Sequence, residues 1–211
     1  MIGFLHTSPV HVPTFDRLAA EVAPGTPVRH VVDESMLADA RAGMAYTGKL
    51  SKAIHGLEGS TVIVCTCSTI GAHAEAADPR VIRVDRPMAA RAARYPRVAV
   101  VAALASTLAP TERLLREEAA RAGTAPALVE VACLDAWSLF EAGDLPAYHQ
   151  AIASRVRGVA PDVDAVVLAQ ASMAPALDYL ADLTVPVLAS PRSAVEYVVR
   201  SSGAHAARTT G

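Results

Sequence analysis

Cysteine is scarce in this chain of 211 residues, with three copies at positions 65, 67 and 133. Three irregularly spaced cysteines do not make a disulfide framework. Cys65 and Cys67 also lack companion ligands at the spacing of a metal site, so we expect no bound metal. Residues 1–5 lack the basic segment and the long apolar segment of a signal peptide. Together these absences predict a cytoplasmic protein with free thiols.

Charge is sparse and balanced. Only 19% of the residues are charged, with 19 Lys and Arg against 21 Asp and Glu, and the formal net charge is -2. The sequence has no run of basic residues, which argues against nucleic acid and anionic membrane as partners. No uncharged stretch approaches the length that a bilayer-spanning helix needs. We therefore expect neither nucleic acid nor a membrane among the partners of this protein.

The sequence lacks the common nucleotide-binding and hydrolase motifs. It has no G-x-G-x-x-G dinucleotide fingerprint and no G-x-S-x-G, the motif of α/β-hydrolases. The stretch GMAYTGKL at 43–50 has the glycine and lysine spacing of a phosphate-binding P-loop, but Leu50 stands where that motif requires serine or threonine. No apolar strand precedes Gly43, so we interpret this stretch as a helix–turn region.

Hydrophobic residues make up 52% of the chain, enough to bury a sizeable core. They form short continuous runs, which are typical of strands covered on both faces. Runs of strand length lie at 1–5, 28–32, 61–66, 81–84, 97–103, 127–133, 163–168 and 185–189. Segments with helical patterns separate them, at 14–22, 87–94, 111–122, 144–157 and 193–200. This alternation predicts an α/β fold with parallel sheets.

The strand–helix pattern occurs twice along the chain. A shift of 103 residues places VIVCTCSTI (62–70) on AVVLAQASM (165–173). A shift of 97 places PTFDRLAAE (13–21) on PTERLLREE (110–118). These matches follow one order along the sequence, and they indicate an internal duplication.

The duplication predicts two pseudo-symmetric α/β halves, each built on a four-stranded parallel sheet. The turn before 193–200 is equivalent to the turn before 87–94, so we expect the last helix to pack on the first half. The first half is then residues 1–95 with 191–211, and the second half is residues 96–190. Ligands of such folds bind at the carboxyl ends of the strands. We therefore expect the site in the cleft between the two halves.

Cys67 directly follows the predicted strand at 61–66 and precedes Ser68 and Thr69. If a helix starts at this point, its dipole favours the thiolate, and the adjacent hydroxyl and backbone N–H groups suit a carboxylate. Such a thiol is a candidate general base or nucleophile. The alternative interpretation is a small buried residue at a tight turn, and for Cys65 and Cys133 we expect a place in the core.

The sequence TCST at 66–69 resembles the A-C-N-T motif of the aspartate/glutamate racemase superfamily. This family comprises cofactor-independent racemases, isomerases and decarboxylases with two pseudo-symmetric α/β halves. Its second motif, of the type G-C-T-H, falls on AQAS at 169–172, where the thiol and the histidine are missing. The resemblance covers essentially the whole chain. It implies a small carboxylic-acid substrate and no cofactor, and a homodimer is a further expectation because dimerisation is common in the family.

The resemblance also implies which residues bind the substrate. The segment GFLHTSP (3–9) is similar to the first substrate loop of the family, and AALASTLAPT (102–111) is similar to the corresponding loop of the second half. These loops and the two motifs contribute Thr7, Ser8, Ser68, Thr69, Ser106, Thr107, Gln170 and Ser172 as candidate substrate ligands. For Gln170 the alternative is a polar residue that is satisfied by the backbone of its own loop.

Four further polar residues stand at predicted strand ends or turns. His6 ends the first strand, where it either reaches the ligand or makes a structural hydrogen bond. Asp33 and Asp85 also follow strands, and they are candidates for binding an amino group, for a second base, or for capping the next helix. Arg192 either pairs with a distal carboxylate of the substrate or is a surface cation.

The missing second thiol limits the chemistry. A two-base racemase needs a proton carrier on each face of the α-carbon, and Gln170 does not exchange a proton near neutral pH. We therefore predict a cofactor-independent isomerase or racemase-like enzyme that acts at the α-carbon of a small carboxylic or amino acid, with Cys67 as its single catalytic thiol. The alternatives are a decarboxylase of a small dicarboxylic acid and a non-catalytic protein that binds a small acid on the same fold.

Overall fold

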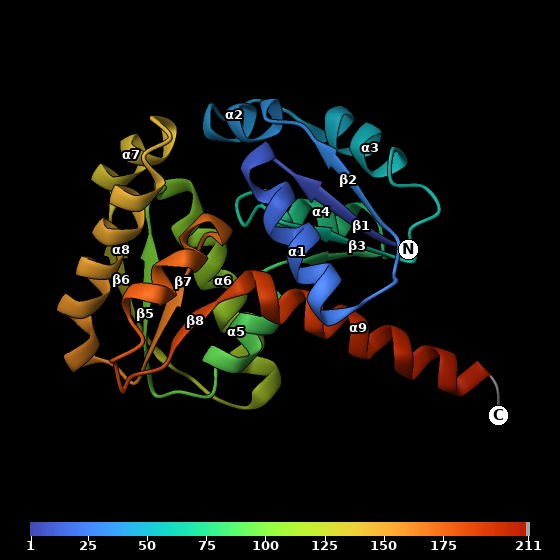
Figure 1. Ribbon diagram of the computed structural model, residues 1–211. Coiled ribbons are helices and arrows are strands. Elements are labelled where there is room, and N and C mark those ends of the chain that lie inside the picture. Colours follow the sequence, from blue (N-terminus) through green and yellow to red (C-terminus); the bar gives the residue numbers. More distant parts are fainter. Residues whose placement is uncertain (210–211) are drawn as a thin grey trace. The chain divides into compact units, whose positions relative to one another are not determined.

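A computed structural model describes the backbone of residues 1–209 and the side chains of residues 1–201 (Figure 1). The contacts divide the chain into two compact units, one formed by Met1–Val84 with the segment that begins at Pro191, and one formed by Asp85–Ser190. Each unit contains a four-stranded parallel sheet flanked by helices. The predicted α/β fold with two four-stranded halves is therefore confirmed, and all eight predicted strands are present.

The first unit has the strand order β2-β1-β3-β4, with every neighbouring pair parallel. Its strands are β1 (Ile2–His6), β2 (Val28–Val32), β3 (Val62–Cys65) and β4 (Val81–Arg83). Its helices are η1 (Pro9–His11), α1 (Val12–Val22), α2 (Ser35–Arg41), α3 (Thr47–His55), α4 (Gly71–Ala77) and α9 (Ser190–Thr209).

Different helices cover the two faces of the first sheet, because consecutive strand residues point to opposite faces. Phe4 of β1 packs with Phe15 of α1 and Val195 of α9 on one face. Cys65 of β3 packs with Leu50 of α3 on the other face. Both faces are therefore apolar, which explains why the strands appear in the sequence as continuous hydrophobic runs.

The second unit has the equivalent strand order, β6-β5-β7-β8. Its strands are β5 (Arg97–Ala102), β6 (Ala127–Ala132), β7 (Ala165–Leu168) and β8 (Val187–Ala189). Its helices are α5 (Arg86–Ala92), α6 (Ala105–Ala122), η2 (Leu134–Ala136), α7 (Trp137–Glu141), α8 (Leu145–Val159), η3 (Ala160–Asp162) and η4 (Ala171–Tyr179). Ile152 of α8 packs with Val101 on one face of this sheet, while Met88 of α5 and Leu114 of α6 pack with Val100 on the other face.

The assignment of helices to units follows from these cores. The helix α5 comes directly after β4 of the first sheet but packs on the second sheet, so the second unit begins at Asp85 and not at residue 96. The first residues of α9 pack on the first sheet through Ala194 and Val198. Each sheet is therefore covered in part by a helix that follows the last strand of the other sheet: α5 follows β4 and packs on the second sheet, and α9 follows β8 and packs on the first.

The helix predicted to start at Thr111 is longer than expected. It begins at Ala105, with Pro110 inside it, and ends at Gly123 in the left-handed conformation that glycine favours. Pro110 supplies no N–H to the carbonyl of Ser106 four residues earlier, and the helix tolerates a loss of one such bond near its start. The prediction of a helix start at Pro110 was wrong, and Ser106 and Thr107 lie in the first turn of α6 and not in a loop.

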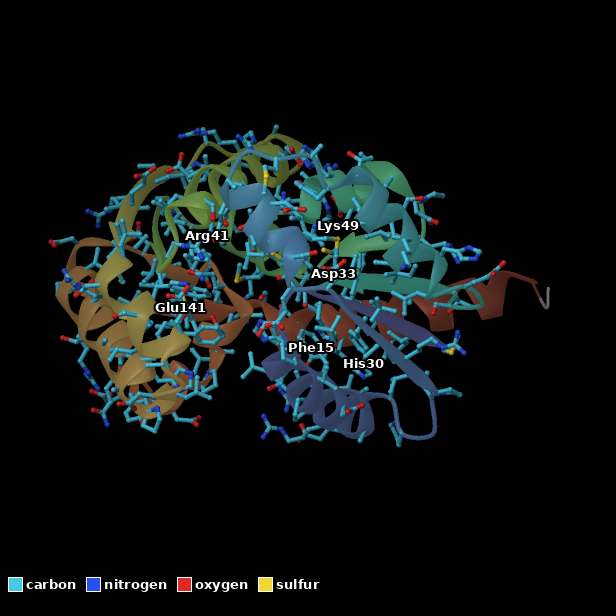
Figure 2. All side chains as sticks on the ribbon, turned by 90° about the horizontal axis from the view of Figure 1, so that it is seen from above. Phe15, His30, Asp33, Arg41, Lys49 and Glu141 are labelled. Atoms are coloured by element: carbon cyan, nitrogen blue, oxygen red, sulfur yellow. The ribbon has the colours of Figure 1, made fainter. Side chains whose placement is uncertain are left out.

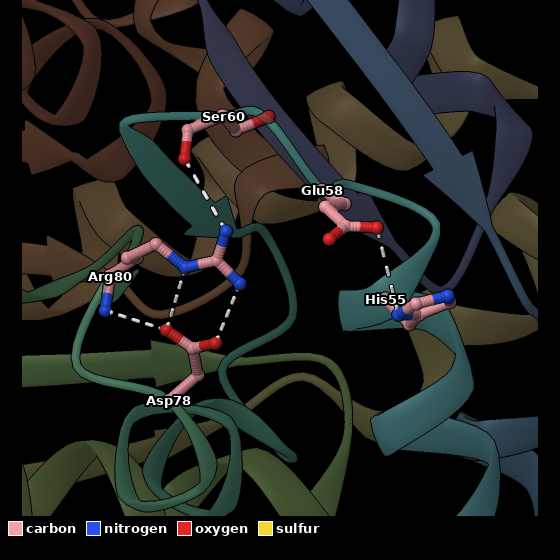
Figure 3. Close-up of polar contacts among 5 residues, drawn as sticks. All are labelled: His55, Glu58, Ser60, Asp78 and Arg80. Atoms are coloured by element: carbon pink, nitrogen blue, oxygen red, sulfur yellow. Dashed lines mark hydrogen bonds and ion pairs between the residues drawn. The ribbon is translucent and has the colours of Figure 1, made fainter.

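Polar contacts fix the turns at the amino ends of β3 and β4 (Figure 3). The guanidinium of Arg80 donates to both carboxylate oxygens of Asp78, at 3.0 and 2.7 Å, and reaches the carbonyl of Ser60 at 3.5 Å. These hydrogen bonds lower the pKa of Asp78. The pair therefore ties the start of one central strand to the start of its neighbour.

The stretch that mimics a P-loop forms the end of a turn and most of α3. Leu50 is buried in the core, and Lys49 pairs with Asp39 of α2. This arrangement confirms that the stretch is a helix–turn region. The Lys49 ammonium pairs with a carboxylate of the protein itself. Within the described residues, none of the helices combines the length and hydropathy that a membrane crossing requires.

Candidate functional site

The carboxyl ends of β1 and β3 meet at the centre of the first sheet, where the strand order reverses direction. In open parallel sheets this is the point at which ligands bind. The chain leaves β1 through His6 and Thr7 and leaves β3 through Thr66 and Cys67. The backbone N–H of Thr66 donates to the carbonyl of Leu5 at 2.9 Å, which holds the two chain ends side by side.

The second sheet has the same corner. The backbone N–H of Ala169 donates to the carbonyl of Val101 at 2.9 Å. Leu5 pairs with Cys65 in the first sheet and Val101 pairs with Leu168 in the second, so the strand registers make Cys67 the structural equivalent of Gln170. The sequence repeat also places Cys67 on Gln170, so the sequence and the strand register agree.

Cys67 is half-buried in the turn after β3, whereas Cys65 and Cys133 are buried. Its carbonyl lies 3.7 Å from the Sγ of Cys65. The next helix, α4, begins only at Gly71, after Ile70 as its N-cap residue. The expectation that a helix starts at Cys67 was therefore wrong, and the dipole of this short helix is too far away to act on the thiol, because that effect falls off within the first turn.

Tyr46 and His73 were missed in the sequence, and the structure brings both to the neighbourhood of Cys67. Tyr46 and Cys67 pack against the same core cluster of the first unit. The Tyr46 hydroxyl is hydrogen-bonded to Nδ1 of His73. Burial raises the pKa of Tyr46, and electrostatic interaction with Cys67 and Cys65 adds to this rise. The phenol therefore remains a proton donor beside the thiol at neutral pH.

Gln170 is tied to the backbone of its own unit. It is buried, and its Oε1 accepts hydrogen bonds from the N–H of Ala103 at 2.6 Å and of Leu104 at 3.3 Å. Ala103 and Leu104 follow β5, the strand next to β7. The amide thus fixes the first turn of the chain after β5.

Ser172 also has partners within the second unit. Its hydroxyl is hydrogen-bonded to the hydroxyl of Tyr148 at 3.0 Å, and its carbonyl accepts from Nε2 of His149 at 3.0 Å. Burial raises the pKa of Tyr148 and lowers the pKa of His149, so both are neutral. The turn after β3, which carries the Cys67 thiol, thus corresponds in the second unit to a turn whose side chains are uncharged and hydrogen-bonded.

His6 is fully buried and makes two side-chain hydrogen bonds. Its Nδ1 lies 2.9 Å from Oγ1 of Thr66, the residue before Cys67, and its Nε2 lies 2.8 Å from Nδ1 of His30. Burial, with smaller effects of His11 and His30, lowers the pKa of His6 to about 3. His6 is therefore neutral, and it is connected to the turn that carries the thiol.

Asp33 and Arg192 have partners in the first unit, and Asp85 lies at a helix start. Asp33 is labelled in Figure 2, and its Oδ1 accepts from the N–H of Ser35 at 3.0 Å in the turn before α2, whose N-cap residue is Glu34. Arg192 pairs with Glu21 of α1, with both side chains about half exposed. Asp85 is fully buried as the N-cap residue of α5, and its carbonyl accepts from the N–H of Ala89.

The remaining predicted ligands fall into one group in each unit. Thr7 and Ser8 follow β1, and Ser68 and Thr69 follow the adjacent β3, so the first group gathers at one sheet edge. Ser106 and Thr107 lie in the first turn of α6. Within the part of the chain that the structure describes, the His, Cys, Asp and Glu side chains form no group of three or more that could hold a metal ion.

Comparison with known proteins identifies the fold. No protein-family model matches the sequence, and no curated protein matches it. The aspartate racemase of Picrophilus torridus aligns with a TM-score of 0.72 and 17% identity, over 96% of this chain and 94% of the racemase. The allantoin racemase of Klebsiella pneumoniae aligns with a TM-score of 0.67 and 20% identity, over 97% and 88% of the two chains.

A third solved structure is a mutant of arylmalonate decarboxylase in a sulfate-associated form. It aligns with a TM-score of 0.52 and 15% identity, over 96% of this chain and 93% of the decarboxylase. At these identities the likeness shows a common fold. It is the fold that the sequence motifs implied, shared by racemases and a decarboxylase.

Proposed function

We propose that this protein is a cofactor-independent isomerase of the racemase type, which acts at the α-carbon of a small carboxylic or amino acid. Cys67 is its catalytic thiol. The observation that carries the proposal is the asymmetry of the two equivalent corners. A half-buried thiol follows β3 in the first unit, and at the equivalent position after β7 the Gln170 amide is bound to backbone N–H groups.

The thiol acts as the base that removes the α-proton, and a second carrier returns a proton to the carbanion. Gln170 does not exchange protons near neutral pH, so the second carrier is another group. Tyr46 has the required properties, because its phenol is protonated and hydrogen-bonded to His73 in the same unit as Cys67. In this scheme Cys67 keeps the α-proton and the phenol gives its own proton to the carbanion. Exchange with solvent, on the phenol side through the hydrogen-bonded His73, then restores the thiolate and the phenol.

The substrate carboxylate requires hydrogen-bond donors close to the thiol. Thr7, Ser8, Ser68 and Thr69 gather with Cys67 at the ends of β1 and β3, and their hydroxyl and backbone N–H groups suit a carboxylate. The second group, Ser106, Thr107, Gln170 and Ser172, belongs to the equivalent corner. Arg192 and Asp33 are less suited to this task, since each is engaged at the surface of the first unit.

The test is α-proton exchange in deuterated water, followed by proton NMR. The panel contains both enantiomers of aspartate and glutamate, allantoin, and arylmalonates, with carbon dioxide release as the readout for the last. We expect exchange with one class of acid, and a loss of at least a hundredfold in Cys67→Ala. The matched control is Cys133→Ala, which changes a buried thiol in the other unit.

The outcomes discriminate between the candidate functions. Carbon dioxide release that depends on Cys67 assigns the decarboxylase, for which one thiol as proton donor is sufficient. Equal exchange in wild type and Cys67→Ala contradicts any catalytic role of the thiol. Saturable binding of an acid without exchange or carbon dioxide release contradicts the enzyme and assigns a binding protein on the same fold.

A further inference from the structure

A row of four side chains runs from the surface of the first unit to the residue next to Cys67. Oδ1 of Asp16 lies 3.0 Å from Nε2 of His30, and Nδ1 of His30 lies 2.8 Å from Nε2 of His6. Nδ1 of His6 lies 2.9 Å from Oγ1 of Thr66, which also lies 3.1 Å from the carbonyl of Leu5. The side chains come from α1, β2, β1 and the turn after β3, so adjacent elements of one sheet layer build the row.

The row is insulated from its surroundings along most of its length. Phe4 stacks on His30 with ring centroids 5.1 Å apart, and Phe15 lies 5.6 Å from the ring of His6. Phe15 and His30 are labelled in Figure 2, on α1 and β2. The exposed fraction of the side chain rises from 14% at His30 to 52% at Asp16, while His6 is fully buried. Solvent therefore reaches the row at its Asp16 end, and the other end, Thr66, is buried beside Cys67 in the sequence.

The titratable groups that face the two imidazoles are few. Besides Asp16 from α1, the neighbour is His11 from η1, whose ring centroid lies 6.3 Å from that of His6. Burial lowers the pKa of His11 to about 4, so it is neutral near pH 7. Arg29 precedes His30 on β2 and points to the other face of the sheet, because strand residues alternate. Among the side chains that the structure describes, the Asp16 carboxylate is therefore the charged group that is hydrogen-bonded to the row.

With His6 neutral, because burial lowers its pKa to about 3, the hydrogen bonds allow two arrangements of protons. A carboxylate only accepts, so Nε2 of His30 carries a hydrogen in both. In the first arrangement His30 is neutral and its Nδ1 accepts from Nε2–H of His6, whose Nδ1 accepts from the Thr66 hydroxyl. In the second arrangement His30 is an imidazolium and donates to Nε2 of His6. The Nδ1–H of His6 then donates to Thr66, and the Thr66 hydroxyl donates to the carbonyl of Leu5.

The two arrangements differ by one proton, and every hydrogen bond between His30 and Thr66 points the other way. A proton accepted by Thr66 Oγ1 displaces the hydroxyl proton to Nδ1 of His6. His6 passes its Nε2 proton to Nδ1 of His30, and the positive charge comes to rest beside the Asp16 carboxylate. The reverse sequence returns one proton to Thr66. His6 is neutral in both arrangements and changes only its tautomer.

We propose that Asp16, His30, His6 and Thr66 form a proton relay, which carries a proton between the turn of Cys67 and the surface pair of His30 and Asp16. Its catalytic use rests on the proposed function of Cys67, since a thiol that removes an α-proton needs a route by which that proton is exchanged. The relay itself is independent of any substrate. Its four members are positioning and proton-transfer residues that act through Thr66.

The direct test is the tautomer of His6, read from long-range proton–nitrogen NMR spectra of protein labelled with ¹⁵N-histidine between about pH 5 and pH 8, the range in which histidine charge changes. We expect the Nε2–H form of His6 in the first arrangement and the Nδ1–H form once the row has taken up a proton. The Asp16→Asn variant removes the carboxylate beside which the second arrangement places its positive charge, so the tautomer change of His6 moves to lower pH. Because Asp16 is half exposed, this variant is expected to fold normally.

The matched control is Glu21→Gln, which removes another exposed carboxylate of α1 and leaves the tautomer change in place. A His6 that keeps one tautomer throughout this pH range, or that becomes doubly protonated within it, overturns the relay. A tautomer change of His6 that occurs at the same pH in Asp16→Asn as in wild type also overturns the relay.

A second measurement connects the relay to the thiol. The alkylation rate of Cys67 with iodoacetamide is expected to show an inflection at the pH of the His6 tautomer change, in addition to the rise from thiol ionisation. Thr66→Val disconnects His6 from the turn and removes that inflection, and Asp16→Asn shifts it. An unchanged profile in both variants contradicts transmission to Cys67.

Failure of the relay and failure of the proposed function are distinguishable. If the tautomer change occurs but no acid undergoes Cys67-dependent exchange, the relay stands and the isomerase proposal falls. If exchange depends on Cys67 while His6 keeps a single tautomer, the isomerase stands and the relay falls.

Discussion

The side-chain oxygen of Gln170 lies 2.6 Å from the backbone nitrogen of Ala103 and serves a second N–H at Leu104. Gln170 is the structural equivalent of Cys67, and in the second unit it has a structural task. A cysteine at this position is too short to accept both hydrogen bonds. The two equivalent positions therefore differ in what they do as well as in residue type.

This contact predicts a loss of stability in Gln170→Leu. Two buried N–H groups lose their acceptor, and an unsatisfied buried polar group costs about 1–3 kcal/mol. We expect a decrease of that size in the free energy of unfolding, measured by urea denaturation. The control is Gln150→Leu on α8, an exposed glutamine, for which the free energy is expected to change by less than about 0.5 kcal/mol. Equal stability of the two variants contradicts a structural role for Gln170.

The three thiols are predicted to react with iodoacetamide at very different rates. Cys67 is half-buried, whereas Cys65 and Cys133 are buried, and burial raises the pKa of Cys133 to about 11. The thiolate is the reactive form, so Cys67 is alkylated first in native protein. Peptide mapping by mass spectrometry measures the order. Modification of Cys133 at the rate of Cys67 contradicts this prediction, and alkylation in urea provides the control in which all three react.

His6 predicts sensitivity to acid. Burial lowers its pKa in the folded protein to about 3, whereas an unfolded histidine titrates near 6.5. Below pH 6.5 the unfolded state therefore binds a proton that the folded state does not, and stability falls as the pH drops toward 3. The slope from one such proton is about 1.4 kcal/mol per pH unit. We expect His6→Gln to be less stable at pH 7 but to have a shallower dependence on pH.

The control for that experiment is His55→Gln, because the His55 side chain is 81% exposed. Its free energy of unfolding, followed by urea titration from about pH 7 to pH 4, is expected to run parallel to that of wild type. A His6→Gln curve that is also parallel to wild type refutes the assignment of the acid sensitivity to His6.

Tyr46 is predicted to report the charge of Cys67. The thiolate charge contributes to the raised pKa of Tyr46, after the larger effect of burial. In Cys67→Ser that charge is absent, so the phenol ionises at lower pH than in wild type. The difference in absorbance at 295 nm between each protein and its Tyr46→Phe variant isolates this phenol. Cys133→Ser, in the other unit, leaves the titration in place, and a Cys67→Ser titration identical to wild type places the two groups out of electrostatic reach.

The strands were predictable because both faces of each sheet are covered. The strands β3 (Val62–Cys65) and β7 (Ala165–Leu168) contain only apolar residues, and each lies within its predicted run, 61–66 or 163–168. The duplication could be recognised in the sequence for the same reason, because equivalent buried strands of the two halves have similar apolar sequences. The bounds of the short helices α2, α4 and α7 were not predicted, because five to seven residues give too little periodicity to recognise.

The candidate site was predictable only where it follows a strand directly. Cys67 and Gln170 were found because each stands just after a buried run of its half. Tyr46 precedes α3 and His73 lies within α4, and no pattern in the sequence connects either of them to Cys67. His30 and Asp16 were missed because side-chain pairing between β2 and α1 depends on packing, which has no local signal.

The crossed placement of α5 and α9 constrains how this protein can be divided. An expression fragment that ends at residue 95 carries away Met88, Ala89 and Ala92, which belong to the core of the second unit. The complementary fragment retains Ala194, Val195 and Val198, which belong to the core of the first. Each fragment therefore exposes an apolar face of its sheet and carries an apolar helix that has no core to pack against. We expect neither fragment to fold on its own, so the two units have to be expressed as one chain.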